Sequence, residues 1–238
     1  MSRIIAAFLG LLVILSVILF LFINSSIINV ASDFTSGDLP TVIIDAGHGG
    51  EDGGTSSADG LLEKSINLSV ANKLATMLEL SGYKVLLTRT DDEQIGDNSL
   101  PTIRQRKISD IKTRLSIAQA YPQALFVSIH QNHYAQAKYR GTQVFYSSKS
   151  YKSKFLAQNI QSSFVRMLQP DNEREIKEVG SNIYLLYNCT NTSVMVECGF
   201  MSNPEEAELL NTEEYQKKIA LSIMCGIISF LEDENGKS

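Results

Sequence analysis

The residues best suited to catalysis or metal binding are three histidines, His48, His130 and His133, which are all the histidines of the chain. His48 and His130 each follow a short apolar run, VII and ALFVSI respectively. Neutral imidazole is the commonest metal ligand. Two imidazole nitrogens and one carboxylate oxygen, with a fourth position left for water, make up the ligand set of catalytic zinc hydrolases. Glu63 is the natural third ligand, and a second carboxylate, Glu197, could accept the proton of a zinc-bound water.

Two other interpretations of the stretch around His48 stay open at this point. Its glycines could simply form a turn, with His48 at the surface and Glu63 as an acid in the first turn of a helix, where the helix dipole favours it. A phosphate-binding loop is the other alternative. That interpretation is weak because the stretch lacks a Gly-Lys-Ser/Thr ending, and because Glu51 and Asp52 would repel a phosphate. The candidate ligands are also scattered along the chain, so no single spacing is diagnostic.

The cysteine content and the net charge narrow the class of protein. Cys189, Cys198 and Cys225 stand in apolar surroundings and do not form a disulfide framework, so we interpret them as buried thiols. A thiol hydrolase that pairs Cys198 with His130 is disfavoured, since period-two alternation turns Cys198 away from the side that Glu197 faces. A net charge of −5 argues against nucleic-acid binding, which normally requires a basic face.

Alternating strands and helices are expected to position these side chains. Short apolar runs predict strands at residues 42–44, 83–87, 124–129, 141–147, 181–186 and 193–197. Apolar residues at three- and four-residue steps predict helices at residues 64–81, 103–118, 156–168 and 213–231. This order is typical of an α/β domain. Ligands of such sheets collect beyond the carboxyl ends of the strands, where His48 and His130 are expected to lie.

The N-terminal region is predicted to be a membrane segment. Residues 4–28 carry no charge and are numerous enough to cross a bilayer as a helix. We expect residues 1–30 to be a membrane anchor or an uncleaved signal, residues 31–40 a tether, and residues 41–232 the folded domain. Arg3 precedes the span, whereas Asp33 and Asp38 follow it, so the positive-inside rule leaves the N-terminus cytoplasmic. The domain is then expected outside the cell, held at the membrane by a single pass.

Five ordered motifs resemble one known family. DAGHGGEDGG, LLEKSINLS, LLTRTD, LFVSIHQN and VMVECGFMSNPEEAELL are similar to motifs of the zinc-dependent N-acetylmuramoyl-L-alanine amidases of bacterial cell walls. The resemblance implies a single α/β domain with a six-stranded mixed, mostly parallel sheet flanked by helices. It also implies one Zn²⁺ held by His48, Glu63 and His130, with Glu197 as catalytic base. The implied reaction is hydrolysis of the amide bond between N-acetylmuramic acid and L-alanine of the peptidoglycan stem peptide.

The motifs SIHQN and VECGF resemble in particular the sporulation, germination-specific branch of the family. Its members are membrane-anchored and prepare spore-cortex peptidoglycan for muramic-δ-lactam formation. A vegetative cell-wall amidase and a catalytically inactive, membrane-anchored binding protein are the alternatives. The presence of His48, Glu63, His130 and Glu197 argues against an inactive protein.

Other expectations concern partners and neighbouring residues. The implied partners are peptidoglycan and, through the N-terminal helix, the membrane, whereas a membrane-tethered regulatory protein or a homodimer is left open. Ser128 and Asn132 flank His130 and could orient the ligands, although structural hydrogen bonding would explain them equally well. His133 is not expected to bind metal, because it follows a strand and helical periodicity does not bring it beside His130.

Overall fold

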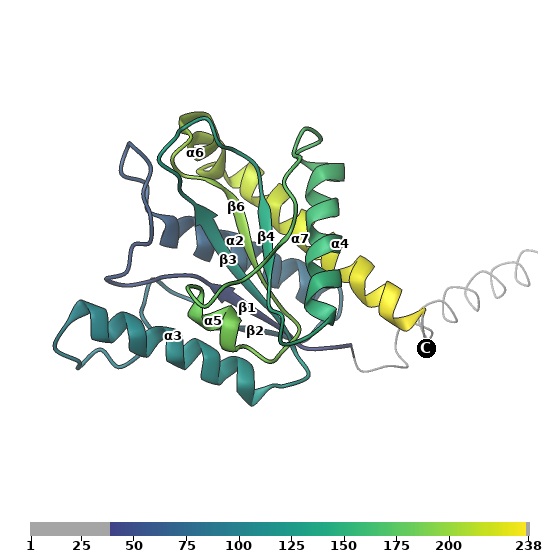
Figure 1. Cartoon of the computed structure of the whole chain (residues 1–238), viewed down its shortest axis with the longest axis horizontal. Coiled ribbons are helices and arrows are strands. Elements are labelled where there is room, and N and C mark those ends of the chain that lie inside the picture. Colours follow the sequence, from purple (N-terminus) through teal and green to yellow (C-terminus); the bar gives the residue numbers. More distant parts are fainter. Residues whose placement is uncertain (1–38, 237–238) are drawn as a thin grey trace, which may run out of the picture. The chain divides into compact units, whose positions relative to one another are not determined.

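A mixed sheet of six strands lies at the centre of residues 39–236, the part of the chain that the computed structural model describes (Figure 1). The strand order is β2-β1-β3-β6-β4-β5. β1, β2, β3 and β6 run parallel to one another, whereas β4 is antiparallel to β6 and parallel to β5. This confirms the predicted six-stranded, mostly parallel sheet. The bounds are Val42–Ala46 for β1, Val85–Leu87 for β2, Leu125–Asn132 for β3, Gln143–Tyr146 for β4, Lys177–Glu178 for β5 and Ser193–Phe200 for β6.

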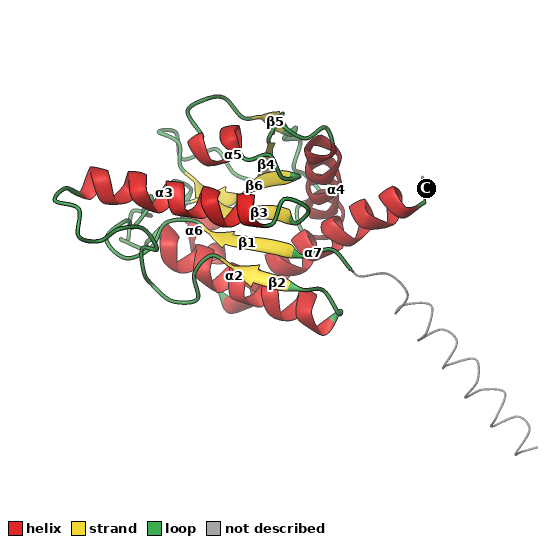
Figure 2. Cartoon of the chain, turned by 90° about the horizontal axis from the view of Figure 1, so that it is seen from below, coloured by secondary structure: helices red, strands yellow, loops and turns green. Residues whose placement is uncertain are grey.

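Helices cover both faces of the sheet (Figure 2). Strand alternation divides the core accordingly, because successive side chains of a strand point to opposite faces. In β3, Val127 and Ile129 pack in the core beneath α2, α4 and α7, whereas Phe126 packs in the core beneath α3 and α5. Ser128 and His130 share the face of Phe126. The helix bounds are Glu63–Leu80 for α2, Ile103–Ala120 for α3, Lys152–Met167 for α4, Tyr184–Asn188 for α5, Pro204–Leu210 for α6 and Glu213–Asn235 for α7.

The predicted strand at residues 181–186 is wrong. The backbone turns after Gly180, where the Ile183 N–H donates to the Gly180 carbonyl, and the short helix α5 follows. Helical geometry allows the adjacent residues Leu185 and Leu186 both to be buried beside α3, whereas a strand would send them to opposite faces. The sixth strand is instead β5, two exposed residues in a segment where the sequence pattern predicts no strand. Helix α6 was not predicted.

The predictions for the N-terminal region concern residues that lie mostly outside the described part of the chain. The predicted anchor, residues 1–30, and all but the last two residues of the predicted tether, 31–40, belong to the part that the structure does not describe. Within residues 39–236, no helix has both the length and the apolar character that a membrane crossing requires.

Candidate metal centre and catalytic site

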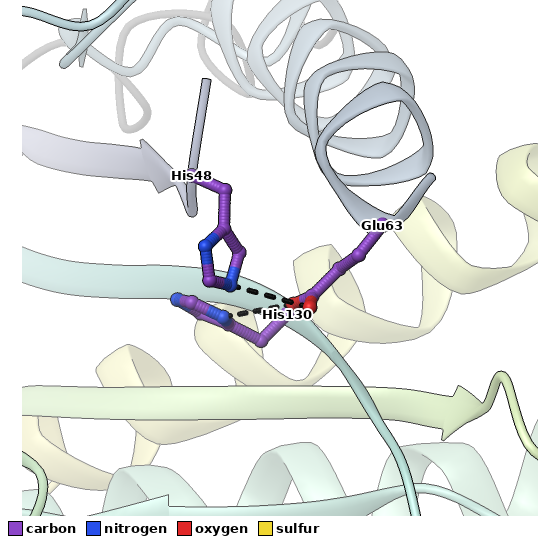
Figure 3. Close-up of side chains that lie close together, drawn as sticks. All are labelled: His48, Glu63 and His130. Atoms are coloured by element: carbon purple, nitrogen blue, oxygen red, sulfur yellow. Dashed lines mark hydrogen bonds and ion pairs between the residues drawn. The ribbon is translucent and has the colours of Figure 1, made fainter. Parts of the chain in front are cut away.

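Three side chains from different elements meet at the carboxyl edge of the sheet (Figure 3). His48 follows β1, Glu63 is the first residue of α2, and His130 lies in β3, two residues before its end at Asn132. Nε2 of His48 lies 3.2 Å from Oε2 of Glu63, and Nδ1 of His130 lies 3.0 Å from Oε1 of the same carboxylate. One ligand atom from each residue falls within 4.8 Å of the others. The fold therefore brings the three predicted ligands together.

The geometry and the charges of this cluster suit a zinc ion. Tetrahedral zinc with bonds of about 2.0 to 2.1 Å has ligand atoms about 3.4 Å apart. Burial lowers the pKa of His48, but its hydrogen bonds to Asp52 and Glu63 outweigh burial and raise that pKa to about 9. The two imidazoles likewise hold the pKa of Glu63 well below its usual range, against the effect of burial. The cluster thus favours added positive charge, which a divalent cation supplies.

Two glycines allow the three side chains to approach so closely. A Cβ on Gly47 would lie 2.2 Å from Nε2 of His130. A Cβ on Gly54 would lie 2.5 Å from Oε2 of Glu63 and 2.8 Å from Cδ2 of His48. His48 itself has φ = 63°, and no other non-glycine residue of the described chain has a positive φ. The glycine-rich loop is therefore shaped around the candidate ligands.

Residues that the sequence analysis did not identify hold the ligands in place. Asp52 Oδ2 lies 2.9 Å from Nδ1 of His48, which leaves Nε2 of that ring for the cluster. The Glu63 carboxylate accepts hydrogen bonds from the backbone N–H groups of Thr55 and Gln131, at 2.9 and 3.0 Å, and from Nδ2 of Asn67 at 3.2 Å. Asn67 stands one helical turn after Glu63, so the spacing of four residues was a usable signal for it.

The two predicted orienting residues make other contacts. Ser128 Oγ donates to Asp45 at 2.6 Å, and Arg114 joins Asp45 to the backbone carbonyl of His48. Ser128 therefore reaches a candidate ligand only through Asp45 and Arg114. The carbonyl of Asn132 accepts a hydrogen bond from the Met201 N–H, which ties the end of β3 to the residue after β6.

Glu197 stands in β6 beside this cluster. It lies opposite His130 in the parallel pairing of β6 with β3. The residue is partly exposed, but its Oε2 atom is buried and has no hydrogen-bond partner among the described residues. Burial and the nearby Glu63 raise the pKa of Glu197 to about 7, although His130 and His48 oppose the rise. A carboxylate with a pKa near neutral and an unpartnered oxygen is suited to proton transfer.

The remaining candidates for the chemistry do not join the site. His133 is exposed beyond the end of β3 and is not part of the His48, Glu63 and His130 cluster. Cys198 packs in the core beneath α2, α4 and α7, and burial raises the pKa of its thiol. Because a thiolate is the reactive form of cysteine, a buried thiol of this kind is a poor nucleophile. The alternation argument against a thiol hydrolase is therefore confirmed.

Comparison with known proteins identifies the family. Residues 42–229 match the model of the N-acetylmuramoyl-L-alanine amidase family, which is zinc-dependent in general. The chain belongs to this family. It is 34% identical over 193 residues to a germination-specific N-acetylmuramoyl-L-alanine amidase from Bacillus subtilis, a match that covers 81% of this chain and 80% of the relative. The chain is therefore an N-acetylmuramoyl-L-alanine amidase that acts on peptidoglycan.

Solved structures give the same family and fold. The CwlD amidase from Clostridioides difficile, solved in complex with the GerS lipoprotein, is 42% identical and superposes with a TM-score of 0.78, covering 81% of this chain and 98% of that chain. A second N-acetylmuramoyl-L-alanine amidase from Clostridium difficile 630 is 31% identical with a TM-score of 0.70, covering 82% and 98% of the two chains.

The amidase has a cavity of about 230 Å³ against its two imidazoles. Ile111 of α3, Tyr184 of α5 and Asn182, which precedes α5, line it together with His48 and His130. A second hollow of about 270 Å³ shares Ile111 and Tyr184 with the first, so the two adjoin. A larger cavity of about 560 Å³ lies elsewhere, near α6, and none of the candidate ligands lines it. Two of the three candidate ligands, His48 and His130, therefore line the smallest of these three cavities.

Proposed function

We propose that this amidase binds one Zn²⁺ through His48, Glu63 and His130 and uses Glu197 as its catalytic base. The observation that carries the proposal is the convergence of two imidazoles and one carboxylate beside the unpartnered, buried oxygen of Glu197. When bound, zinc lowers the pKa of a water ligand to roughly 7 and polarises a carbonyl oxygen, as a Lewis acid does. An otherwise inert amide can then be hydrolysed near neutral pH.

Other residues of the chain orient the proposed ligands, and Glu197 transfers the proton. Asp52 binds Nδ1 of His48 and so fixes the ring orientation that offers Nε2 to the metal. Hydrogen bonds from Thr55 N–H, Gln131 N–H and Asn67 Nδ2 hold the Glu63 carboxylate in one orientation. Glu197 accepts the proton of the attacking water on its unpartnered oxygen and delivers it to the departing amine.

The substrate bond is the amide between the lactyl group of N-acetylmuramic acid and the L-alanine of the stem peptide. Its hydrolysis gives a lactyl carboxylate on the glycan and a free α-amine on the peptide. We place this bond in the cavity beside the imidazoles, because two of the proposed ligands, His48 and His130, line it. Asn182 and Tyr184 would then contact the substrate directly.

The setting that we propose for this reaction is the spore cortex. Support comes from the germination-specific amidase of Bacillus subtilis and from the 42% identity to the CwlD amidase. Removal of a stem peptide frees the lactyl carboxyl group, which is the group that must close a muramic-δ-lactam ring. A vegetative wall amidase is the second candidate, because other amidases of the family match over similar lengths of this chain.

Anchoring and partnership are also part of the proposal. Residues 1–30 would hold the amidase in the cell membrane as a single pass, with the catalytic domain outside the cytoplasm. In a sporulating cell this domain would lie in the space between the forespore and mother-cell membranes. The CwlD amidase was solved in complex with a lipoprotein. A membrane-tethered protein partner is therefore the kind of regulator that we propose for this chain.

The test of the activity uses purified peptidoglycan and mass spectrometry. The zinc-loaded amidase should release stem peptides with a free N-terminal L-alanine and leave glycan strands that carry free lactyl groups. Glu197→Gln, purified in parallel, should give neither product under the same conditions. Cleavage within the glycan or within the peptide, with the muramoyl amide intact, would contradict the proposed reaction.

The test of the cortex role uses a spore-forming bacterium that lacks its own cortex amidase. Expression of the wild-type chain should restore muramic-δ-lactam to the cortex, and expression of Glu197→Gln should not. Digestion of vegetative walls by the purified enzyme together with a cortex that stays free of lactam would favour the vegetative alternative.

A further inference from the structure

Arg89 is a buried arginine that the proposed mechanism does not use. It follows β2 within the LLTRTD motif and is only 2% exposed. Its guanidinium donates to four backbone carbonyls: Nε to Ala46 at 2.9 Å, Nη2 to Gly47 at 3.1 Å and to Lys64 at 2.8 Å, and Nη1 to Asp91 at 3.0 Å. Four of its N–H directions are thus occupied by main-chain oxygens.

The partners of Arg89 are unusual for a buried guanidinium. Arg114, which is equally buried, pairs with the carboxylates of Asp45 and Asp110. The hydrogen bonds of Arg89 go to carbonyl oxygens instead. Burying a charge is costly unless it is compensated, and carbonyl dipoles compensate a cation less fully than a carboxylate does. A buried arginine that served only to fill the core would be better replaced by an apolar side chain, so its carbonyl contacts point to a further role.

Three of these four carbonyls belong to the two segments that carry the proposed metal ligands, and the fourth, that of Asp91, lies in the loop of Arg89 itself. Ala46 and Gly47 immediately precede His48, and Lys64 immediately follows Glu63. A single atom, Nη2 of Arg89, bridges the two segments, because it donates to the carbonyls of both Gly47 and Lys64. The side chain therefore spans from the end of β1 to the first turn of α2. The backbone that it holds leads directly into the left-handed conformation of His48.

We propose that Arg89 is a positioning residue that sets the separation between His48 and Glu63 and thereby the affinity of the site for zinc. This inference rests on the proposed metal ligands. Lysine cannot replace it, because one ammonium group has only three N–H donors and cannot make all four carbonyl contacts of the guanidinium. Arg114 supports the same loop, since its Nη2 donates to the carbonyl of His48 at 2.7 Å.

The test compares zinc affinity with folding stability in the full-length chain, purified in detergent. Arg89→Lys should bind zinc on the order of 10- to 100-fold more weakly than the wild type in a chelator competition assay, the usual effect of losing a contact that orients a ligand. Zinc should also raise its melting temperature by less than it raises that of the wild type, because stabilisation by a ligand follows its affinity. Arg89→Gln provides a second variant, without the charge, if Arg89→Lys fails to fold.

The matched control is Ile160→Val, which shortens a fully buried side chain of α4 in the core beneath α2, α4 and α7, outside the segments that carry the proposed ligands. This variant should lower the melting temperature and keep wild-type zinc affinity. An Arg89 variant that binds zinc as tightly as the wild type would overturn the inference, as would an Ile160→Val variant that loses affinity equally. A wild-type chain that does not bind zinc would instead overturn the proposed metal site itself.

Discussion

Glu197 of β6 and His130 of β3 are direct partners in the parallel pairing of the two strands. Neighbouring strands of a sheet lie about 4.8 Å apart, so the ladder itself sets the spacing between the proposed base and one proposed ligand. The other two ligands come from a loop and from a helix start, and their spacing depends on the contacts of the glycine-rich segment. The site therefore combines one rigid pair with one adjustable pair.

Asp52 is expected to control how well His48 binds metal. Asp52→Ala removes the carboxylate that orients the His48 ring, so zinc affinity should fall on the order of 10- to 100-fold. Zinc dissociation constants, measured with a competing chelator, test this. Glu51→Ala is the control, because it removes a neighbouring ion pair, to Arg106, without touching a ligand. Equal affinity in Asp52→Ala and wild type would show that His48 is oriented by other contacts.

Gly54 and Gly60 offer a matched pair of substitutions. Both have positive φ, 70° and 83°, so alanine should cost each site a similar backbone strain of roughly 1 to 2 kcal/mol. Only at Gly54 would the new Cβ meet Glu63 and His48, whereas nothing lies within 4 Å at Gly60. Gly54→Ala should therefore bind zinc at least about tenfold more weakly than Gly60→Ala. Similar zinc content in both purified variants would count against the close packing described here.

Replacing any of the three proposed ligands should lower the zinc content far more than replacing His133. His48→Ala, Glu63→Ala and His130→Ala should each lose most of the bound zinc. His133→Ala should keep one zinc per chain, because His133 is exposed outside the cluster. Elemental analysis of the purified variants, after dialysis against metal-free buffer, measures this. Loss of zinc from His133→Ala together with its retention in His130→Ala would exchange the roles of the two residues.

Glu197 should make the stability of the zinc-free protein depend on pH. Its pKa rises from an ordinary value of 4.5 to about 7 in the folded chain, chiefly through burial. A carboxyl group with a raised folded-state pKa contributes stability below its unfolded pKa and loses that contribution as the pH rises through the folded one. The free energy of unfolding should thus decrease by about 3 kcal/mol between pH 4.5 and 7 through this group. Urea titrations should show a smaller decrease in Glu197→Gln, and equal decreases would contradict the shifted pKa.

The sequence predicted the strands that carry the site better than it predicted the rest of the sheet. The apolar runs of β1, β3 and β6 are rich in branched residues, because parallel central strands are buried on both faces. β5 has only two exposed residues and no apolar pattern that could reveal it. Residues 181–186 resemble a strand in sequence, because burying one side of a short helix also places apolar residues next to each other.

The candidate ligands could be predicted, but most of their supporting contacts could not. Histidine and glutamate are recognisable by their chemistry, whereas the partners of Glu63 include the backbone N–H groups of Thr55 and Gln131, which any residue type could supply. The contact of Arg89 with Lys64 joins segments 25 residues apart and depends on how β2 and α2 pack. Such contacts follow from tertiary structure and leave no local pattern.

The measurement that tests the account most directly compares Glu63→Gln with Glu197→Gln, with zinc content and amide-cleavage rate determined on the same two preparations. Glu197→Gln should keep its zinc and lose on the order of 10²- to 10⁴-fold in turnover, the usual contribution of a positioned general base. Glu63→Gln should lose zinc, because a neutral amide replaces a charged ligand poorly. A zinc-free Glu197→Gln together with a zinc-loaded but inactive Glu63→Gln would contradict the assignment of ligand and base.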